Sequence, residues 1–119
     1  MSADENNIQN LLNYVETIDN QRYKKIVKGI ITNDKNKSVV EALLQAKDTK
    51  GEPLLDNHNM VMFLYNAKHT IENSPDKIHE TLANPEIIKQ ISSGKNRAGG
   101  LWLVTSSKDT FPNKYYSGR

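Results

Sequence analysis

The chain has 119 residues, no cysteine and a formal net charge of +2. This size fits one domain, and the absence of cysteine excludes disulfides, thiolate metal sites and cysteine nucleophiles. No apolar run reaches the roughly 20 residues of a membrane span, and the acidic start, with Asp4 and Glu5, is unlike a signal peptide. We therefore expect no membrane association and a cytoplasmic protein, or one that is delivered by a secretion machine without a cleaved signal.

The first part of the chain predicts three amphipathic helices. Apolar residues recur at helical spacing over residues 8–18 and again over residues 23–31. Asp19 is a candidate N-cap for the second of these helices. Ser38 and Glu41 form the capping-box pattern that precedes a short third helix.

A fourth helix of about 16 residues is predicted after Asp56, a candidate N-cap. Besides its main apolar stripe it carries a second stripe at offsets 0, 4, 7 and 11, formed by His58, Met62, Tyr65 and His69. Tyrosine and methionine are enriched in the cores of protein interfaces. Either neighbouring helices of the same chain cover this stripe, or it binds a protein partner or a second copy in a homodimer.

The last third predicts two short helices and then a change of character. Pro75 and Pro85 suit first helical positions. Residues 94–100 are glycine-rich and predict a flexible connector. The short apolar run of residues 101–104 suits either a strand or a buried turn of helix; we interpret it as an extended segment that packs across the bundle, with Trp102 in the core. The expected fold is all-α, a small antiparallel bundle of five to six helices over residues 1–93. Residues 94–119 then form the connector and a basic, aromatic tail packed on the same domain.

The chain lacks the residue sets that catalysis and metal binding need. His58 and His69 would stand about 16 Å apart on one helix, at a rise of about 1.5 Å per residue, which is too far to share a metal ion. No G-x-S-x-G pattern is present, and the acids Asp76 and Glu80 suit a solvated helix face. We expect no catalytic residues, no metal site and no cofactor.

An alternative function follows from the basic C-terminal segment, because residues 89–119 carry six basic side chains against one acid. Backbone N–H groups of the glycine-rich stretch beside Lys95 and Arg97 could form an anion cradle. Lys108 and Lys114 extend the basic set among aromatic residues, which suits a nucleotide or nucleic-acid binding module. The stretch lacks the spacing of a Walker phosphate-binding loop.

The chain is free of cysteine, rich in Asn, Lys and Ile, helical throughout and empty of catalytic motifs. In this overall character it resembles the small regulatory proteins of the Legionella type IV secretion repertoire, and most of all the inhibitor of the ubiquitin-directed deamidase and transglutaminase effectors. The resemblance assigns no role to individual residues. It implies an inhibitor that occupies the ubiquitin or conjugating-enzyme binding surface of its target. The leading prediction is therefore a non-catalytic protein that binds and regulates an enzyme.

Overall fold

The computed structural model describes residues 3–106, with side chains from residue 7 onward. Within this range the regular structure consists of eight α-helices and one 3-10 turn, and it contains no β-strand. The bounds are α1 Ala3–Val15, α2 Gln21–Thr32, η1 Asp34–Asn36, α3 Lys37–Gln45, α4 Asn57–Asn66, α5 Lys68–Asn73, α6 Pro75–Leu82, α7 Pro85–Ser93 and α8 Arg97–Ser106. The all-α prediction is confirmed, with more helices than the five to six expected. None of these helices is long and apolar enough to span a bilayer.

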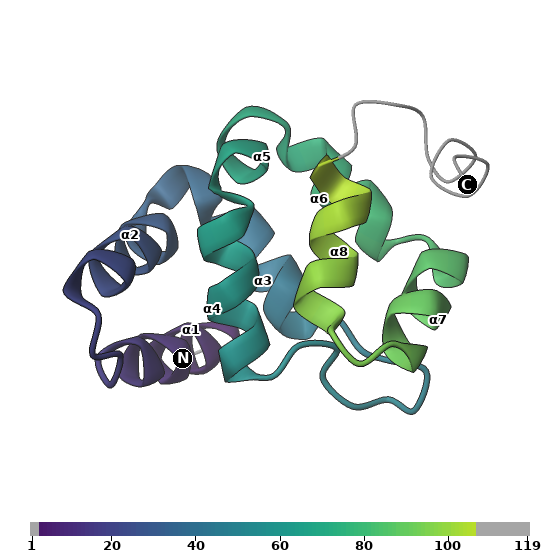
Figure 1. Cartoon of the computed structure of the whole chain (residues 1–119), viewed down its shortest axis with the longest axis horizontal. Helices are drawn as coiled ribbons and strands as arrows, with labels where there is room; N and C mark the ends of the chain where they lie inside the picture. The colour runs from purple at the N-terminus through teal and green to yellow at the C-terminus, as the bar shows by residue number, and fades with distance from the viewer. Residues whose placement is uncertain (1–2, 107–119) are drawn as a thin grey trace.

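The helices surround α4, which runs through the middle of the molecule with α8 beside it (Figure 1). The α1–α2 pair lies at one end and α7 at the other, and α3 lies behind α4. In Figure 1 both α4 and α8 run upward, so this central pair is parallel. The predicted antiparallel bundle covered residues 1–93, so this pair, which includes α8, lies outside that prediction.

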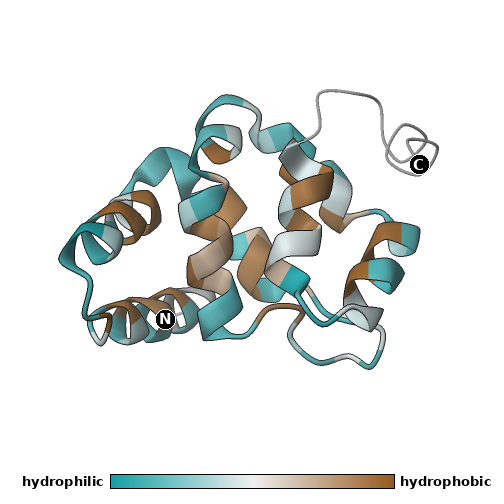
Figure 2. Ribbon diagram, viewed as in Figure 1, coloured by the Kyte–Doolittle hydropathy of each residue, from teal (hydrophilic) through white to brown (hydrophobic). Residues whose placement is uncertain are grey.

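One apolar core holds these helices together. Figure 2 shows the apolar residues as a stripe along one side of α2 and of α7 and over most of α4. Each helix contributes a side chain that is at most 2% exposed, in chain order Leu11, Ile30, Leu43, Phe63, Ile71, Ile78, Ile87 and Leu101. Because burial of one such side chain contributes about 1.5–3 kcal/mol, this core is the main source of stability.

Two predicted helix starts were wrong by one or two residues. The Oδ1 atom of Asn20, rather than Asp19, accepts the N–H of Tyr23 at 3.0 Å and caps α2. Helix α3 begins at Lys37 directly after η1, so Ser38 lies inside the helix and no capping box forms. At α2 the neighbouring polar residue takes the cap. At α3 the N-cap residue Asn36 makes no side-chain cap bond, because its Nδ2 donates instead to the carbonyl oxygen of Ile30 at 3.0 Å.

Three predicted helix starts are confirmed. Asp56 caps α4, its Oδ1 accepting the N–H of Asn59 at 2.8 Å. Pro75 and Pro85 occupy the first positions of α6 and α7. The predicted 16-residue fourth helix is instead two helices, because α4 ends at Asn66 and α5 begins after Ala67, whose backbone departs from helical geometry with ψ of 17°.

The structure corrects the prediction for residues 94–106. Residues 97–106 are the helix α8, so no extended segment forms and the connection after α7 is limited to residues 94–96. The Oδ1 atom of Asn96 accepts the N–H of Gly99 at 2.8 Å and so caps this helix. A Cβ atom at Gly99 would lie 2.7 Å from Nδ2 of Asn96, so a larger residue here would displace the capping amide. Leu101 and Val104 are buried, which shows that packing against the core offsets the low helix propensity of the glycines.

Candidate protein-binding face

Three large apolar side chains are exposed among the residues whose side chains the structure describes. Tyr65 on α4 is 36% exposed, and Trp102 and Leu103 on α8 are 37% and 48% exposed. The two helices that carry these side chains, α4 and α8, lie side by side (Figure 1). We call the surface formed by Tyr23, Met62, Tyr65, Trp102 and Leu103 the aromatic face.

Tyr65 is held in place by a tyrosine of another helix. Its ring packs edge to face against Tyr23 of α2, with ring centroids 4.7 Å apart and an interplanar angle of 67°. Burial raises the pKa of Tyr23 above its ordinary value of 10.0, and the nearby phenols of Tyr14 and Tyr65 raise it further. Tyr23 therefore stays neutral at physiological pH, and aromatic side chains of α1, α2 and α4 meet at this edge of the face.

Trp102 connects the face to the end of α4. Its indole Nε1 donates a hydrogen bond of 3.1 Å to the carbonyl oxygen of Asn66, the last residue of α4. The prediction that Trp102 lies in the core is wrong, because the helical turn of α8 buries Leu101 and Val104 and leaves Trp102 outside. The bond fixes an exposed indole ring beside the helix that carries Tyr65.

The structure keeps most of the predicted second stripe together. His58, Met62 and Tyr65 share the outer side of α4, with Met62 half-buried and His58 exposed. His69 is also exposed but belongs to α5, beyond the break at Ala67. The sequence analysis missed Tyr23 as a neighbour of this stripe, since 42 positions separate it from Tyr65 and no local pattern joins them.

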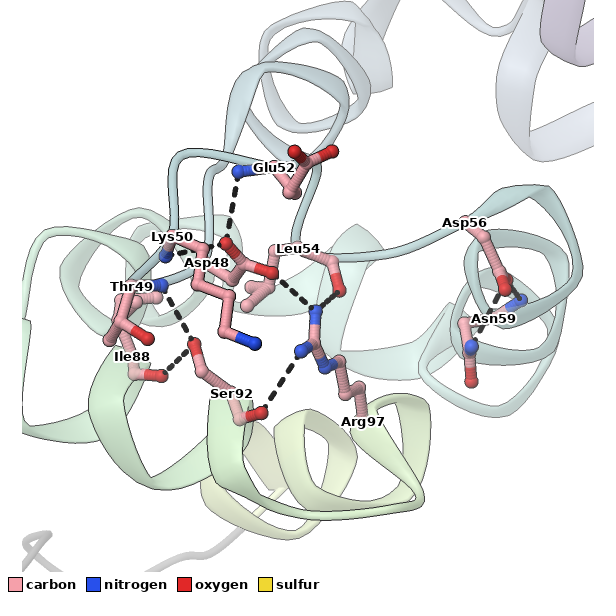
Figure 3. Close-up of polar contacts among 10 residues, drawn as sticks. All are labelled: Asp48, Thr49, Lys50, Glu52, Leu54, Asp56, Asn59, Ile88, Ser92 and Arg97. Carbon is pink, nitrogen blue, oxygen red and sulfur yellow. Dashed lines mark hydrogen bonds and ion pairs between the residues drawn. The ribbon is translucent and has the colours of Figure 1, made fainter.

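A second site, which is polar, lies at the start of α8, where the Arg97 side chain donates hydrogen bonds to three acceptors (Figure 3). Its Nη1 donates to Oδ2 of Asp48 and to the carbonyl of Leu54, both at 3.1 Å, and its Nη2 donates to the carbonyl of Ser92 at 2.9 Å. The guanidinium thus joins α7 and α8 to the loop between α3 and α4. We call this arrangement the Asp48–Arg97 clamp.

Asp48 is the acidic centre of the clamp, with a side chain only 6% exposed. Its Oδ1 accepts the backbone N–H groups of Lys50 at 2.8 Å and Glu52 at 2.9 Å, as Figure 3 shows. Burial acts to raise the pKa of this carboxyl. The hydrogen bonds from Glu52 and Lys50, together with the bond and charge of Arg97, outweigh burial and hold the pKa below its ordinary value of 3.8. Asp48 is therefore ionised and pins the turn at Gly51, whose φ is +82°.

The clamp uses Arg97, one of the four residues of the predicted anion site. Arg97 is committed to acceptors of its own chain, and the exposed Lys95 lines a groove of about 380 Å³ that also contains Glu52 and Asp56. An anion in this groove would meet carboxylates. The other two residues of the predicted set, Lys108 and Lys114, lie outside the described residues.

The structure also brings a serine to a histidine, which the sequence analysis did not anticipate. Ser38 Oγ on α3 lies 3.2 Å from Nε2 of His79 on α6, beside a groove of about 290 Å³ lined mostly by apolar residues. A catalytic triad requires a third group that orients the histidine, and no described carboxylate bonds to His79. The contact joins α3 to α6. Across residues 3–106, no cluster of three or more potential metal ligands is present.

Comparison with protein-family models, with curated proteins and with solved structures finds no significant match for this chain.

Proposed function

We propose that this protein is a non-catalytic binding protein that docks on an enzyme through its aromatic face and regulates that enzyme. The observation that carries the proposal is the exposure of Tyr65, Trp102 and Leu103 on two adjacent helices of a chain whose other large apolar side chains, within the described part, are buried or half-buried. Apolar surface left outside such a core is what a protein interface uses.

The aromatic face has the properties of an interface centre. Tyrosine and tryptophan supply large contact areas with few rotatable bonds, and they dominate the binding energy of many interfaces. Here Tyr65 is already packed on Tyr23, and the indole of Trp102 is already bonded to Asn66. Because these side chains are ordered before binding, a partner gains contact area at a small cost in side-chain entropy.

We propose inhibition as the mode of regulation. The chain's resemblance to the inhibitor of ubiquitin-directed deamidase and transglutaminase effectors supports this proposal, and it suggests an effector of that kind as the target. The protein would then cover the surface on which the target binds ubiquitin or a conjugating enzyme. The Asp48–Arg97 clamp would take no direct part, since its polar groups are used within the chain.

The test is affinity purification from the native cell and its host with a matched pair of variants. Leu103→Glu places a charge in the aromatic face, and Gln90→Glu places the same charge on the exposed surface of α7. We expect the wild type and Gln90→Glu to capture one enzyme in a stoichiometric complex and to lower its activity, and Leu103→Glu to do neither. Equal capture and inhibition by both variants would contradict the proposed face.

A further inference from the structure

An apolar groove lies between α3 and the neighbouring helices α6 and α7, and it shares no residue with the aromatic face. It has a volume of about 290 Å³ and lies beside the contact between Ser38 and His79. We infer that this groove binds a small aliphatic carboxylate, a free fatty acid of medium chain length. The inference goes beyond the proposed function, because a ligand in the groove would leave the aromatic face free for a protein partner.

The walls of the groove are mostly aliphatic. The apolar residues that line it are Ala42 of α3, Ala46 at the end of α3, Leu82 of α6, Ala83 at the end of α6 and Ile88 of α7. Leu82 and Ile88 are half-buried, so each still exposes part of an aliphatic side chain. An alkyl chain in the groove would remove this surface from water, which is favourable.

The groove also carries a free cation and no carboxylate. Lys47 lines it and has no ion-pair partner among the described residues. The acids of α3 and α6, which are Glu41, Asp76 and Glu80, do not line the groove. A carboxylate bound there would meet an unpaired ammonium group, whereas in the groove at the clamp it would meet other carboxylates.

The size of the groove indicates the length of the ligand. At about 30 Å³ for a group the size of a water molecule, about 290 Å³ holds about nine such groups. Octanoate, an acid of about this size, would place its carboxylate at Lys47 and its alkyl chain against the alanines. A protein partner commonly buries about 800 Å² of each surface, so a groove formed by so few residues suits a small molecule better.

The experiment titrates octanoate into the full, isotope-labelled chain at neutral pH and follows backbone amide shifts by NMR. Amides of Ala42, Ala46 and Ala83 report the groove, and the indole Nε1 signal of Trp102, the one tryptophan of the chain, reports the aromatic face. We expect saturable shifts at the groove and none at Trp102. The control ligands are butanoate and octan-1-ol. Butanoate should bind at least about tenfold more weakly, because it lacks half of the alkyl chain, and octan-1-ol about threefold more weakly, because it lacks the charge.

Two lysine variants test the charge. Lys47→Gln should weaken octanoate about threefold and leave the affinity for octan-1-ol unchanged, since only the carboxylate uses the ammonium group. Lys25→Gln removes the same charge from the exposed surface of α2, outside the groove, and should change neither affinity. Circular dichroism checks that each variant is folded.

Two glutamate variants test the position. Ala83→Glu places a carboxylate in the exposed part of the groove wall and should weaken octanoate at least about tenfold, by repulsion and by filling space. Gln90→Glu places the same charge on the exposed surface of α7, outside the groove, and should change the affinity less than about twofold.

Several results would overturn the inference: equal binding of octan-1-ol and octanoate, equal losses in the two lysine variants, equal losses in the two glutamate variants, or shifts confined to Trp102. The absence of saturable shifts at about 10 mM octanoate would overturn it as well. Groove shifts that grow with protein concentration without ligand would instead assign the groove to a second copy of the chain. None of these results decides whether an enzyme is captured through Leu103, so the proposed function stands or falls separately.

Discussion

Helix α8 has two ends of opposite character, and their comparison separates stability from binding in this protein. At its start, Arg97 is committed to three acceptors of its own chain in the Asp48–Arg97 clamp. Further along, Trp102 and Leu103 leave apolar surface exposed. The polar groups of the clamp are already hydrogen-bonded within the chain, so few of them remain free to bond a partner. The exposed side chains of Trp102 and Leu103, in contrast, can be buried by a partner. Substitutions in the clamp should therefore change stability, and substitutions in the aromatic face should change binding.

The largest effect is expected at Arg97. Arg97→Ala removes three hydrogen bonds and leaves the carbonyls of Leu54 and Ser92 without their donor, so unfolding free energy should fall by about 2–3 kcal/mol. Urea denaturation followed by circular dichroism measures this loss. Lys95→Ala, an exposed neighbour, is the control and should change stability by less than about 0.5 kcal/mol. Equal effects of the two variants would show that the clamp does not support the fold.

The clamp should also make the free energy of unfolding depend on pH under acid conditions. The pKa of Asp48 is lowered in the folded protein, so the unfolded chain takes up the proton first as the pH falls. The contribution of Asp48 is thus complete above its ordinary pKa of 3.8 and is lost as the pH falls through the lower folded value. We expect the free energy of unfolding of the wild type to exceed that of Asp48→Asn. Denaturation at a series of pH values should show this difference shrinking as the pH falls through the range.

Glu16 provides a comparison for this pH dependence. Its pKa is lowered by the hydrogen bond and charge of Lys28, and then by Lys24, on an exposed surface. Solvent and salt screen this exposed pair. Glu16→Gln should therefore change the pH dependence of stability at acid pH less than Asp48→Asn does, and high salt should remove the effect of Glu16→Gln first. A larger effect of Glu16→Gln would mean that the clamp is not the dominant acid-sensitive contact.

A moderate effect is expected from the tyrosine pair that supports the aromatic face. In a double-mutant cycle with Tyr23→Leu and Tyr65→Leu, the edge-to-face contact should appear as a coupling of about 1 kcal/mol. Leucine preserves most of the apolar contact, so the cycle isolates the interaction between the rings. Additive effects of the two substitutions would show that the rings pack independently.

Tyr23 makes the same edge of the face sensitive to alkaline pH. Its pKa is raised by burial and by the neighbouring phenols, so the folded state holds the proton more tightly than the unfolded chain does. This contribution is complete below 10.0 and is lost as the pH rises through the higher folded value. Tyr23→Phe should therefore flatten the alkaline decline in stability. An ultraviolet titration in which Tyr23→Phe removes no late-ionising phenol would contradict this assignment.

The smallest effect on stability is expected at Leu103. Leu103→Glu alters a side chain that is 48% exposed, so unfolding free energy should change by less than about 0.5 kcal/mol while partner binding is lost. The same denaturation and capture experiments measure both quantities. A loss of stability as large as that of Arg97→Ala would remove the distinction between the two ends of α8.

The candidate site was predicted in part. The outer side of α4 could be derived from the spacing of His58, Met62 and Tyr65, because helical periodicity is a local property. The partners that complete the face could not, since Tyr23 and Trp102 reach α4 from other parts of the chain. A helical reading of residues 97–106 would have placed Trp102 on the outer side, but the glycines of residues 94–100 favoured a connector.

The sequence by itself determined the features that depend on a few neighbouring residues. These are the all-α class, the cap at Asp56 and the helix starts at Pro75 and Pro85, where one side chain or one fixed φ angle suffices. Only the tertiary structure decided that residues 97–106 form a helix, that the fourth helix breaks at Ala67 and that Asp48 meets Arg97 from 49 positions away. These depend on burial and on contacts between distant segments, which offset unfavourable local propensities only when the whole core is assembled.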